Sequence, residues 1–311
     1  MSNGFWNGKK VLVTGASGFL GGWVCKALIR EGATVFGITT QENPLTWKYH
    51  GISEKVQKVT MDITSPAEVE KFFRENKPDF CFHFAGKSNP AQVEADPVET
   101  IKVNVGGTIA LALTCSHTKV PMLFSSTINI FGPRDQIDDA TPASPNAFYG
   151  KTKLLAEDIL RILAEKRILD VIIVRIANLF GPINPNEKGQ YINNNLINLL
   201  QKKPLEKKPN YFRDFVYVED AVQGIFSLAP FTASHSGGSF ILSFGTSYSG
   251  EEIVDGMQSK MQGKRVVFTP VQGIRVKGQK IRELTGWSPS HSLEDGLDKT
   301  IEWYKQNGSF R

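Results

Sequence analysis

Residues 9–23 restrict the fold of this chain more than any other stretch does. The apolar run Val11–Val13 predicts a strand of a parallel sheet that is buried on both faces. Three glycines follow at intervals of three: Gly15, Gly18 and Gly21. The apolar residues of 19–28 then recur with a helical period. This order predicts a dinucleotide site, because glycine lets the backbone approach a pyrophosphate and the helix N-terminus offers it N–H groups.

The first 175 residues repeat this alternation of strand and helix. Further buried strands are predicted at 35–38, 56–61, 80–84, 122–124 and 171–175, with helices beginning near Ser65, Val98 and Tyr149. The pattern predicts an α/β fold, a doubly wound Rossmann sheet with parallel strands. We expect residues 1–177 to form this NAD(P)-binding domain, with 213–244 returning to it. Residues 178–212 and 245–311 then form a small C-terminal lobe that binds substrate at the carboxyl edge of the sheet.

The composition fits a cytoplasmic enzyme. With 41% apolar and 22% charged residues, the 311-residue chain has enough apolar side chains for a large core. The densest lysine cluster, 201–208, has no interleaved aromatic residues, so we expect no nucleic-acid partner. Cys25, Cys81 and Cys115 lie far apart in apolar segments, which predicts reduced core residues and no metal site. We expect no membrane partner, since the sequence has neither a signal-peptide pattern nor an apolar run of spanning length.

The end of the second predicted strand leaves the choice of dinucleotide open. An acidic residue at this position would bind the adenosine ribose of NAD. The chain instead has Thr39, Thr40 and Gln41, although Lys48 could reach a 2′-phosphate. NAD and NADP therefore both remain candidate cofactors.

Tyr149 and Lys153 are spaced i, i+4 and share one face of a predicted helix. The ammonium group of Lys153 and an oxidised nicotinamide ring would both favour the phenolate form of Tyr149. Such a tyrosine can take a proton from a hydroxyl as hydride leaves, or return one to a carbonyl. Thr127 lies at the carboxyl end of the strand 122–124, after Ser125 and Ser126. Its hydroxyl can therefore hold the same substrate oxygen by a hydrogen bond.

The motifs together resemble a known family. In chain order they are Thr14–Gly21, Asp62-Ile63, His83–Gly86, Asn104, Ser125–Thr127, Tyr149 with Lys153, Arg175–Pro182, Arg213–Asp220 and Gly286–Pro289. Over nearly its whole length the chain resembles an extended short-chain dehydrogenase/reductase of the NAD-dependent nucleotide-sugar epimerase/dehydratase family. Its opening, Phe5–Lys10, is most similar to that of CDP-glucose 4,6-dehydratases.

The resemblance implies roles for individual residues. Catalysis would fall to Thr127, Tyr149 and Lys153. Cofactor binding would involve Gly15, Ser17, Gly18, Phe19, Leu20, Thr39, Asp62, Ile63, Phe84, Ala85, Gly86, Lys87, Asn104, Ser125, Tyr149, Lys153 and Ile176. Substrate binding would involve Lys87, Ser126, Thr127, Asn129, Asn178 and Arg213. Structural alternatives remain for three of these positions or their neighbours: Asp62 could cap a turn, Asn104 could brace two segments, and buried His83 fits a structural role better than a catalytic one.

Two departures from the family pattern bear on the reaction. Dehydratases of this family place an acidic residue directly after the threonine, where this chain has Ile128 and Asn129. Neither side chain titrates, so elimination of water is disfavoured. The segment before Arg213 is also short, and only Arg275 precedes Lys280 where an arginine–aspartate pair is expected, which leaves the nucleotide base undetermined.

The sequence therefore predicts an oxidoreductase acting at C4 of a nucleotide-linked hexose. One reaction consumes NAD(P)H and reduces a 4-keto, 6-deoxy sugar. The other retains NAD and gives net 4-epimerisation. A 4,6-dehydratase and a non-catalytic dinucleotide sensor fit the residues less well. The resemblance also implies a homodimer formed through helices 98–116 and 149–165.

Overall fold

The computed structural model describes residues 4–185 and 190–308. Its largest element is a seven-stranded sheet in the order β10-β7-β5-β4-β1-β2-β3, in which all neighbouring strands are parallel. The strands are β1 (Lys10–Thr14), β2 (Thr34–Ile38), β3 (Val56–Val59), β4 (Phe80–His83), β5 (Met122–Thr127), β7 (Val171–Ile176) and β10 (Ser239–Leu242). The predicted doubly wound α/β fold is confirmed.

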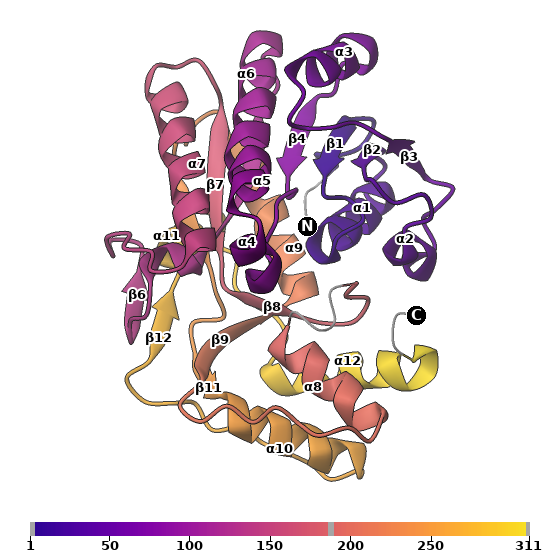
Figure 1. The fold of residues 1–311 in the computed structure, drawn as a ribbon, viewed down its shortest axis with the longest axis vertical. Helices are drawn as coiled ribbons and strands as arrows, with labels where there is room; N and C mark the ends of the chain where they lie inside the picture. The colour runs from indigo at the N-terminus through magenta and orange to yellow at the C-terminus, as the bar shows by residue number, and fades with distance from the viewer. Residues whose placement is uncertain (1–3, 186–189, 309–311) are drawn as a thin grey trace.

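Helices cover both faces of this sheet (Figure 1). The helices α3 (Pro66–Asn76), α6 (Thr108–Thr118) and α7 (Phe148–Glu165) share one hydrophobic core with side chains such as Phe124 and Ile173. The helices α1 (Phe19–Arg30) and α9 (Val218–Leu228) share another core on the opposite face, with the alternate residues Leu123 and Ile172. Successive side chains of one strand thus enter two different cores, which explains the continuous apolar runs in the sequence.

A small lobe lies below the carboxyl ends of the large sheet (Figure 1). It has a three-stranded sheet of β8 (Asn178–Phe180), β9 (Phe212–Tyr217) and β11 (Ser247–Ser249). Its helices are α8 (Tyr191–Leu200), α10 (Gly250–Met261) and α12 (Leu293–Asn307), and its core is separate from the other two. Within the segment 213–244, β9 belongs to this small sheet, whereas α9 packs beside α1 and β10 joins the large sheet.

The remaining elements are short. They are α2 (Leu45–His50), α4 (Pro90–Ala95), α5 (Pro97–Ile101), the π-helical turn η1 (Lys102–Gly107), η2 (Ile128–Phe131), η4 (Ala229–Phe231), α11 (Gln279–Thr285) and the pair β6 (Gln136–Asp138) and β12 (Arg275–Lys277). The single helix predicted over 98–116 is therefore interrupted by the wider turn η1. No helix in the described ranges is apolar over enough residues to span a bilayer.

The helix predicted to begin near Ser65 is confirmed as α3, and Ser65 is its N-cap. The hydroxyl of Ser65 accepts a hydrogen bond from the N–H of Glu68, and Pro66 occupies the first helical position. The carboxylate of Glu68 does not return to Ser65 but accepts from the N–H of Asp62 at 3.0 Å. The cap therefore fixes the loop after β3 to the start of α3.

Candidate active site

A cleft of about 520 Å³ lies between the carboxyl ends of the large sheet and the small lobe. Fifteen of the residues predicted for the site line it: Gly15, Ser17, Gly18, Phe19, Leu20, Phe84, Ala85, Gly86, Ser125, Ser126, Thr127, Tyr149, Lys153, Ile176 and Asn178. They come from both sides of the boundary between β1 and β4, where the strand order reverses. Ligands of doubly wound sheets bind at this kind of boundary.

The glycine turn between β1 and α1 leaves no room for a side chain at Gly15 or at Gly21. Gly15 has φ +65°, and a Cβ there would lie 2.8 Å from the backbone nitrogen of Ala85. A Cβ on Gly21 would lie 2.1 Å from the carbonyl oxygen of Gly15. Gly18 is the N-cap of α1, and the first turn of this helix has no acidic residue. This cradle at a helix N-terminus suits the pyrophosphate of a dinucleotide.

Hydroxyl groups occupy the end of β2 next to this turn. The Thr39 hydroxyl donates to Ser17 Oγ at 2.8 Å and accepts from the N–H of Gln41 at 3.0 Å. Thr39 is buried and lies behind Ser17, which itself lines the cleft. A neutral hydroxyl pair therefore stands where an NAD enzyme commonly has a carboxylate for the ribose.

His83 ties the glycine turn to β4. Its ring nitrogens lie 2.7 Å from Thr14 Oγ1 and 2.9 Å from Thr108 Oγ1, and the same Thr14 hydroxyl accepts from the N–H of Ala85. Burial lowers the pKa of His83 to about 3, with a smaller contribution from Lys153. The imidazole is therefore neutral and holds two threonines, which matches the structural role considered for it.

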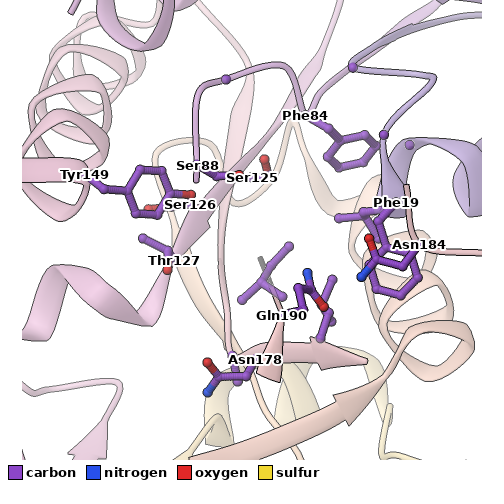
Figure 2. Close-up of a pocket in the computed structure, with 18 of the residues that line it drawn as sticks. Phe19, Phe84, Ser88, Ser125, Ser126, Thr127, Tyr149, Asn178, Asn184 and Gln190 are labelled. Carbon is purple, nitrogen blue, oxygen red and sulfur yellow. The ribbon is translucent and has the colours of Figure 1, made fainter. Parts of the chain in front are cut away.

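Thr127, Tyr149 and Lys153 meet in the cleft. Figure 2 shows Tyr149 extending from α7 toward the end of β5, where Ser126 and Thr127 lie. Thr127 is the N-cap of η2, and its hydroxyl accepts from the N–H of Asn129 at 3.2 Å. The start of α7 is fixed against η2, because a Cβ on Gly150 would lie 2.6 Å from the carbonyl oxygen of Asn129. The Nζ atom of Lys153 lies 4.0 Å from the centroid of the Phe124 ring.

Burial sets the protonation of Tyr149 and Lys153 in the protein without ligands. Burial raises the pKa of Tyr149 to about 12, so the phenol form predominates at neutral pH. Burial also lowers the pKa of Lys153 to about 7, against an opposing effect of Glu157. The predicted phenolate requires an oxidised nicotinamide ring as well as Lys153, so it stays a prediction for the complex with the cofactor.

Asn104 braces three segments from inside η1. Its side-chain oxygen accepts from the N–H of Lys87 at 2.7 Å, and its amide donates to the carbonyl of Lys87 and to Thr152 Oγ1. Asn104 and Lys87 are not part of the cleft lining, although Gly86 is. The bracing alternative thus describes the observed bonds, and it fixes the loop after β4 to the turn of α7 that carries Lys153.

Asp62 and Ile63 lie outside the cleft lining. The Asp62 carboxylate accepts from both the N–H and the hydroxyl of Thr64 at 2.8 Å. These bonds lower its pKa and match the turn-capping alternative. Ile63 packs against η1, where a Cβ on Gly107 would lie 2.8 Å from the Ile63 side chain.

The predicted substrate residues divide into two groups. Ser126, Thr127 and Asn178 line the cleft, and the Asn178 amide donates to the carbonyl of Asp214. The Ser126 hydroxyl is buried and has no hydrogen-bond partner within residues 4–185 and 190–308. Asn129 and Arg213 are exposed and outside the lining; the Arg213 guanidinium stacks over the Tyr211 ring at 4.3 Å.

Sequence reasoning missed the part of the cleft that the small lobe and nearby loops supply. These residues are Ser88, Ala177, Leu179, Asn184, Pro185, Gln190, Tyr191, Ile192, Tyr211 and Phe215, whereas Gly21, which also lines the cleft, belongs to the predicted glycine turn. Tyr191 and Tyr211 form an aromatic pair with ring centroids 4.7 Å apart. The tyrosines before and after a lysine-rich loop were the available signal, but nothing in the sequence showed that this loop folds back. Among the described lining residues there is no Asp or Glu.

Comparison with known proteins gives a consistent picture. The sequence model of the "NAD dependent epimerase/dehydratase family" matches residues 11–240. UDP-glucuronic acid decarboxylase 1 of Danio rerio is 25% identical over 318 residues, which cover 96% of this chain and 73% of the relative. UDP-glucose 4-epimerase of Azospirillum brasilense is 26% identical over 325 residues, covering 94% of this chain and 91% of the relative.

A solved structure shows the same fold. The UDP-glucose 4-epimerase of Thermotoga maritima, determined with UDP-glucose, superposes with a TM-score of 0.85. The superposition covers 96% of this chain and all of the other, at 23% sequence identity. The similarity extends through both the large sheet and the small lobe.

Proposed function

Because the chain belongs to the NAD-dependent epimerase/dehydratase family, we propose that it is a nucleotide-sugar oxidoreductase acting at C4 of the hexose. We propose more specifically that it reduces a 4-keto, 6-deoxy sugar nucleotide with NAD(P)H. The observation that carries this proposal is the meeting of Thr127, Tyr149 and Lys153 in one cleft with the glycine turn.

The side chains suit proton transfer to a ketone. The nicotinamide cofactor, when bound, supplies the hydride that reduces C4. Tyr149 is a phenol at neutral pH and can give its proton to the carbonyl oxygen that becomes the hydroxyl. Thr127 can orient that oxygen by a hydrogen bond. Lys153, one helical turn from Tyr149, stabilises the phenolate that proton donation leaves behind.

Elimination of water is not part of this proposal. A 4,6-dehydratase needs an acid and a base near C5 and C6, and the described lining residues include no carboxylic acid. Ile128 is buried and Asn129 is an exposed amide, and neither lines the cleft. Two hydroxyls, Ser126 and Thr127, lie there instead, which suits binding of a sugar without removal of its C5 proton.

The second candidate is a 4-epimerase that retains NAD. The 26% identical relative that is named a UDP-glucose 4-epimerase favours this reaction. The same three catalytic side chains would then act in both directions, with Tyr149 first accepting and then returning a proton. The two candidates differ in whether the cofactor stays bound or is consumed.

The end of β2 favours NADP(H) over NAD(H). Thr39 and Ser17 offer hydroxyls rather than a carboxylate, so nothing in this pair repels a 2′-phosphate. Lys58 lies at the same edge, since its ammonium donates to the carbonyl of Glu42 at 3.0 Å. A consumed NADPH fits the reductase better than the epimerase.

We also propose that two parts of the chain bind different ligands and that two copies of the chain form a dimer. Residues 1–177, with 213–244, would bind the cofactor, and residues 178–212 and 245–311 the nucleotide sugar. Apolar side chains on α5 and α7 are exposed: Val98 by 78%, Ile101 by 46%, Leu155 by 49% and Ile162 by 50%. Such a set suits burial between two copies of the chain. The three buried free cysteines suit the reducing cytoplasm.

Incubation with a panel of sugar nucleotides and their 4-keto derivatives tests the proposal. The reductase consumes NADPH stoichiometrically with a 4-keto substrate, and the freshly purified protein shows no bound nicotinamide in its absorbance spectrum. Co-purifying NAD together with net interconversion of two 4-epimers would establish the epimerase instead. Binding of the cofactor without turnover of any sugar would identify a sensor.

A further inference from the structure

A buried ion pair lies behind the catalytic lysine and has no part in the chemistry described so far. Glu157 of α7 is fully buried. Its carboxylate accepts from Arg175 of β7 through Nε at 3.2 Å and Nη2 at 2.8 Å, and from the half-buried Arg161. Arg175 is only 7% exposed and stacks over the Phe131 ring at 5.2 Å. Burying two charges costs desolvation energy that apolar residues of similar size would not require.

The position of this pair connects it with the active site. Tyr149, Lys153 and Glu157 follow one another at intervals of four along α7, so they lie on one face of the helix, which contacts β5 and β7. The carboxylate therefore lies one turn beyond the ammonium of Lys153, on the side away from Tyr149.

The groups around Lys153 determine which charges act on its ammonium. On β5 the ammonium meets the ring of Phe124, and on β4 it acts on His83, which is neutral. On its own helix it has the phenol of Tyr149 toward the cleft and Glu157 behind. Among the described groups that act on Lys153, Glu157 is the one anion, and the charge of Arg175 partly offsets it.

We propose that Glu157 and Arg175 are positioning residues that together set the protonation of Lys153. Glu157 stabilises the ammonium form of Lys153, and Arg175 weakens this effect of Glu157. The proposal rests on the proposed function only in that Lys153 assists Tyr149. Burial alone lowers the pKa of Lys153, Glu157 opposes that fall, and the net pKa of about 7 lies in the range where the two forms coexist. A small change in either partner therefore changes the fraction of protein that carries the ammonium.

Opposite charge changes should shift the titration of Lys153 in opposite directions. The Cε resonance of Lys153, assigned with Lys153→Arg, is followed against pH in the protein without ligands after selective labelling of lysine. Glu157→Gln should lower the midpoint by about 1 pH unit, since it leaves the two arginines unopposed. Arg175→Gln should raise the midpoint, because Glu157 then keeps only Arg161. The double variant should return close to the original value.

Asp158→Asn is the matched control, because Asp158 also pairs with Arg161 but its side chain is 55% exposed. It should leave the midpoint unchanged. If both single variants lower the melting temperature while the midpoint stays fixed, the pair is purely structural and the proposal fails. If Glu157→Gln does not fold, the difference between Arg175→Gln and the double variant decides by itself. Turnover does not enter this measurement, so a failure of the proposed reaction would be seen separately, and the pH–rate profile should shift with the midpoints if that reaction is right.

Discussion

At the scale of single residues, burial decides which proton is available in the cleft. The i, i+4 spacing of Tyr149 and Lys153 predicts a phenolate when an oxidised nicotinamide ring is also bound. In the structure desolvation raises the pKa of the phenol to about 12 and lowers that of the amine to about 7. In the protein without ligands Tyr149 is therefore in its phenol form at neutral pH, the form that the proposed reduction requires of a proton donor.

Tyr149→Phe should reduce kcat by about 10²–10⁴-fold, because only the proton donor is lost while the ring still fills its place. Cofactor affinity, measured by quenching of protein fluorescence, should remain within a few-fold of the original. Tyr49→Phe serves as the control, since Tyr49 lies on α2 against Trp303 and outside the cleft lining. Equal turnover of Tyr149→Phe and the unchanged protein would show that this phenol donates no proton.

The buried imidazole of His50 makes the stability of the fold depend on pH. His50 is buried against Trp23, neither of its ring nitrogens has a hydrogen-bond partner among the described residues, and burial lowers its pKa to about 3. The unfolded chain, with a pKa near 6.5, binds the proton more readily, so stability falls as pH falls from about 6.5 toward 3.

His50→Phe should remove this loss of stability in acid. It should also stabilise the fold by about 1 kcal/mol at neutral pH, because it replaces an unsatisfied polar ring by an apolar one. Urea unfolding between pH 7 and pH 5 measures both effects. A steeper acid loss in the variant than in the unchanged protein would contradict the assignment. His83 should behave differently: its nitrogens bond two threonines, so His83→Phe should destabilise the fold.

At the scale of elements, the sequence predicted what local chemistry determines and missed what distant packing determines. The apolar run before Gly15 and the helical period after Gly18 sufficed to predict β1 and α1. The turn η1 could not be predicted, because the contact of Gly107 with Ile63 and the bonds of Asn104 arise only in the folded protein. The far wall of the cleft was missed for the same reason, since Tyr191 and Tyr211 are brought together by the small lobe.

Gly21→Ala should destabilise the fold by about 1–3 kcal/mol, because its Cβ would lie 2.1 Å from the carbonyl oxygen of Gly15 and force α1 away from the turn. The displacement should also weaken dinucleotide binding. Gly106→Ala is the matched control: apart from the neighbouring backbone of its own helix, no described residue has an atom within 4 Å of its Cβ position, so stability should stay the same or rise. Thermal unfolding and cofactor titration measure the two effects. Equal behaviour of the two variants would contradict the close packing of the turn.

The end of β2 gives a prediction about cofactor choice. Thr39→Asp would place a carboxylate beside Ser17 that can accept both ribose hydroxyls of NADH and repel a 2′-phosphate. Affinity for NADH should rise roughly tenfold and that for NADPH should fall by at least as much. Ser234→Asp adds the same charge on an exposed surface outside the cleft lining and should change neither. Fluorescence titration with both cofactors measures the ratio, and an unchanged ratio would place the ribose elsewhere.

At the scale of the whole molecule, the two parts of the chain depend on one another. The strand β8 begins two residues after β7 ends, so the small lobe continues directly from the central sheet. The Asp214 carboxylate of β9 accepts from the N–H groups of Phe244, Gly245 and Thr246, just beyond β10. These links fix the wall that carries Tyr211 and Phe215 relative to Thr127, Tyr149 and Lys153. The cleft therefore belongs to both parts, and α7, which borders it, has exposed apolar residues, as does α5.

The exposed apolar residues of α5 and α7 suit a contact between two copies of the chain. Leu155 and Ile162 lie on the outer side of α7, each about half exposed, while Tyr149 and Lys153 of the same helix line the cleft. If two copies pair through α5 and α7, the double variant Leu155→Glu, Ile162→Glu should be monomeric in sedimentation equilibrium, because four carboxylates would be buried in the dimer. Its turnover should also fall, since α7 loses the support that fixes its catalytic face. Val267→Glu is the control, because Val267 is 75% exposed in the small lobe and should affect neither mass nor turnover. A dimer that persists in the double variant would show that the subunits meet elsewhere, whereas an unchanged protein that is already monomeric would rule out the dimer.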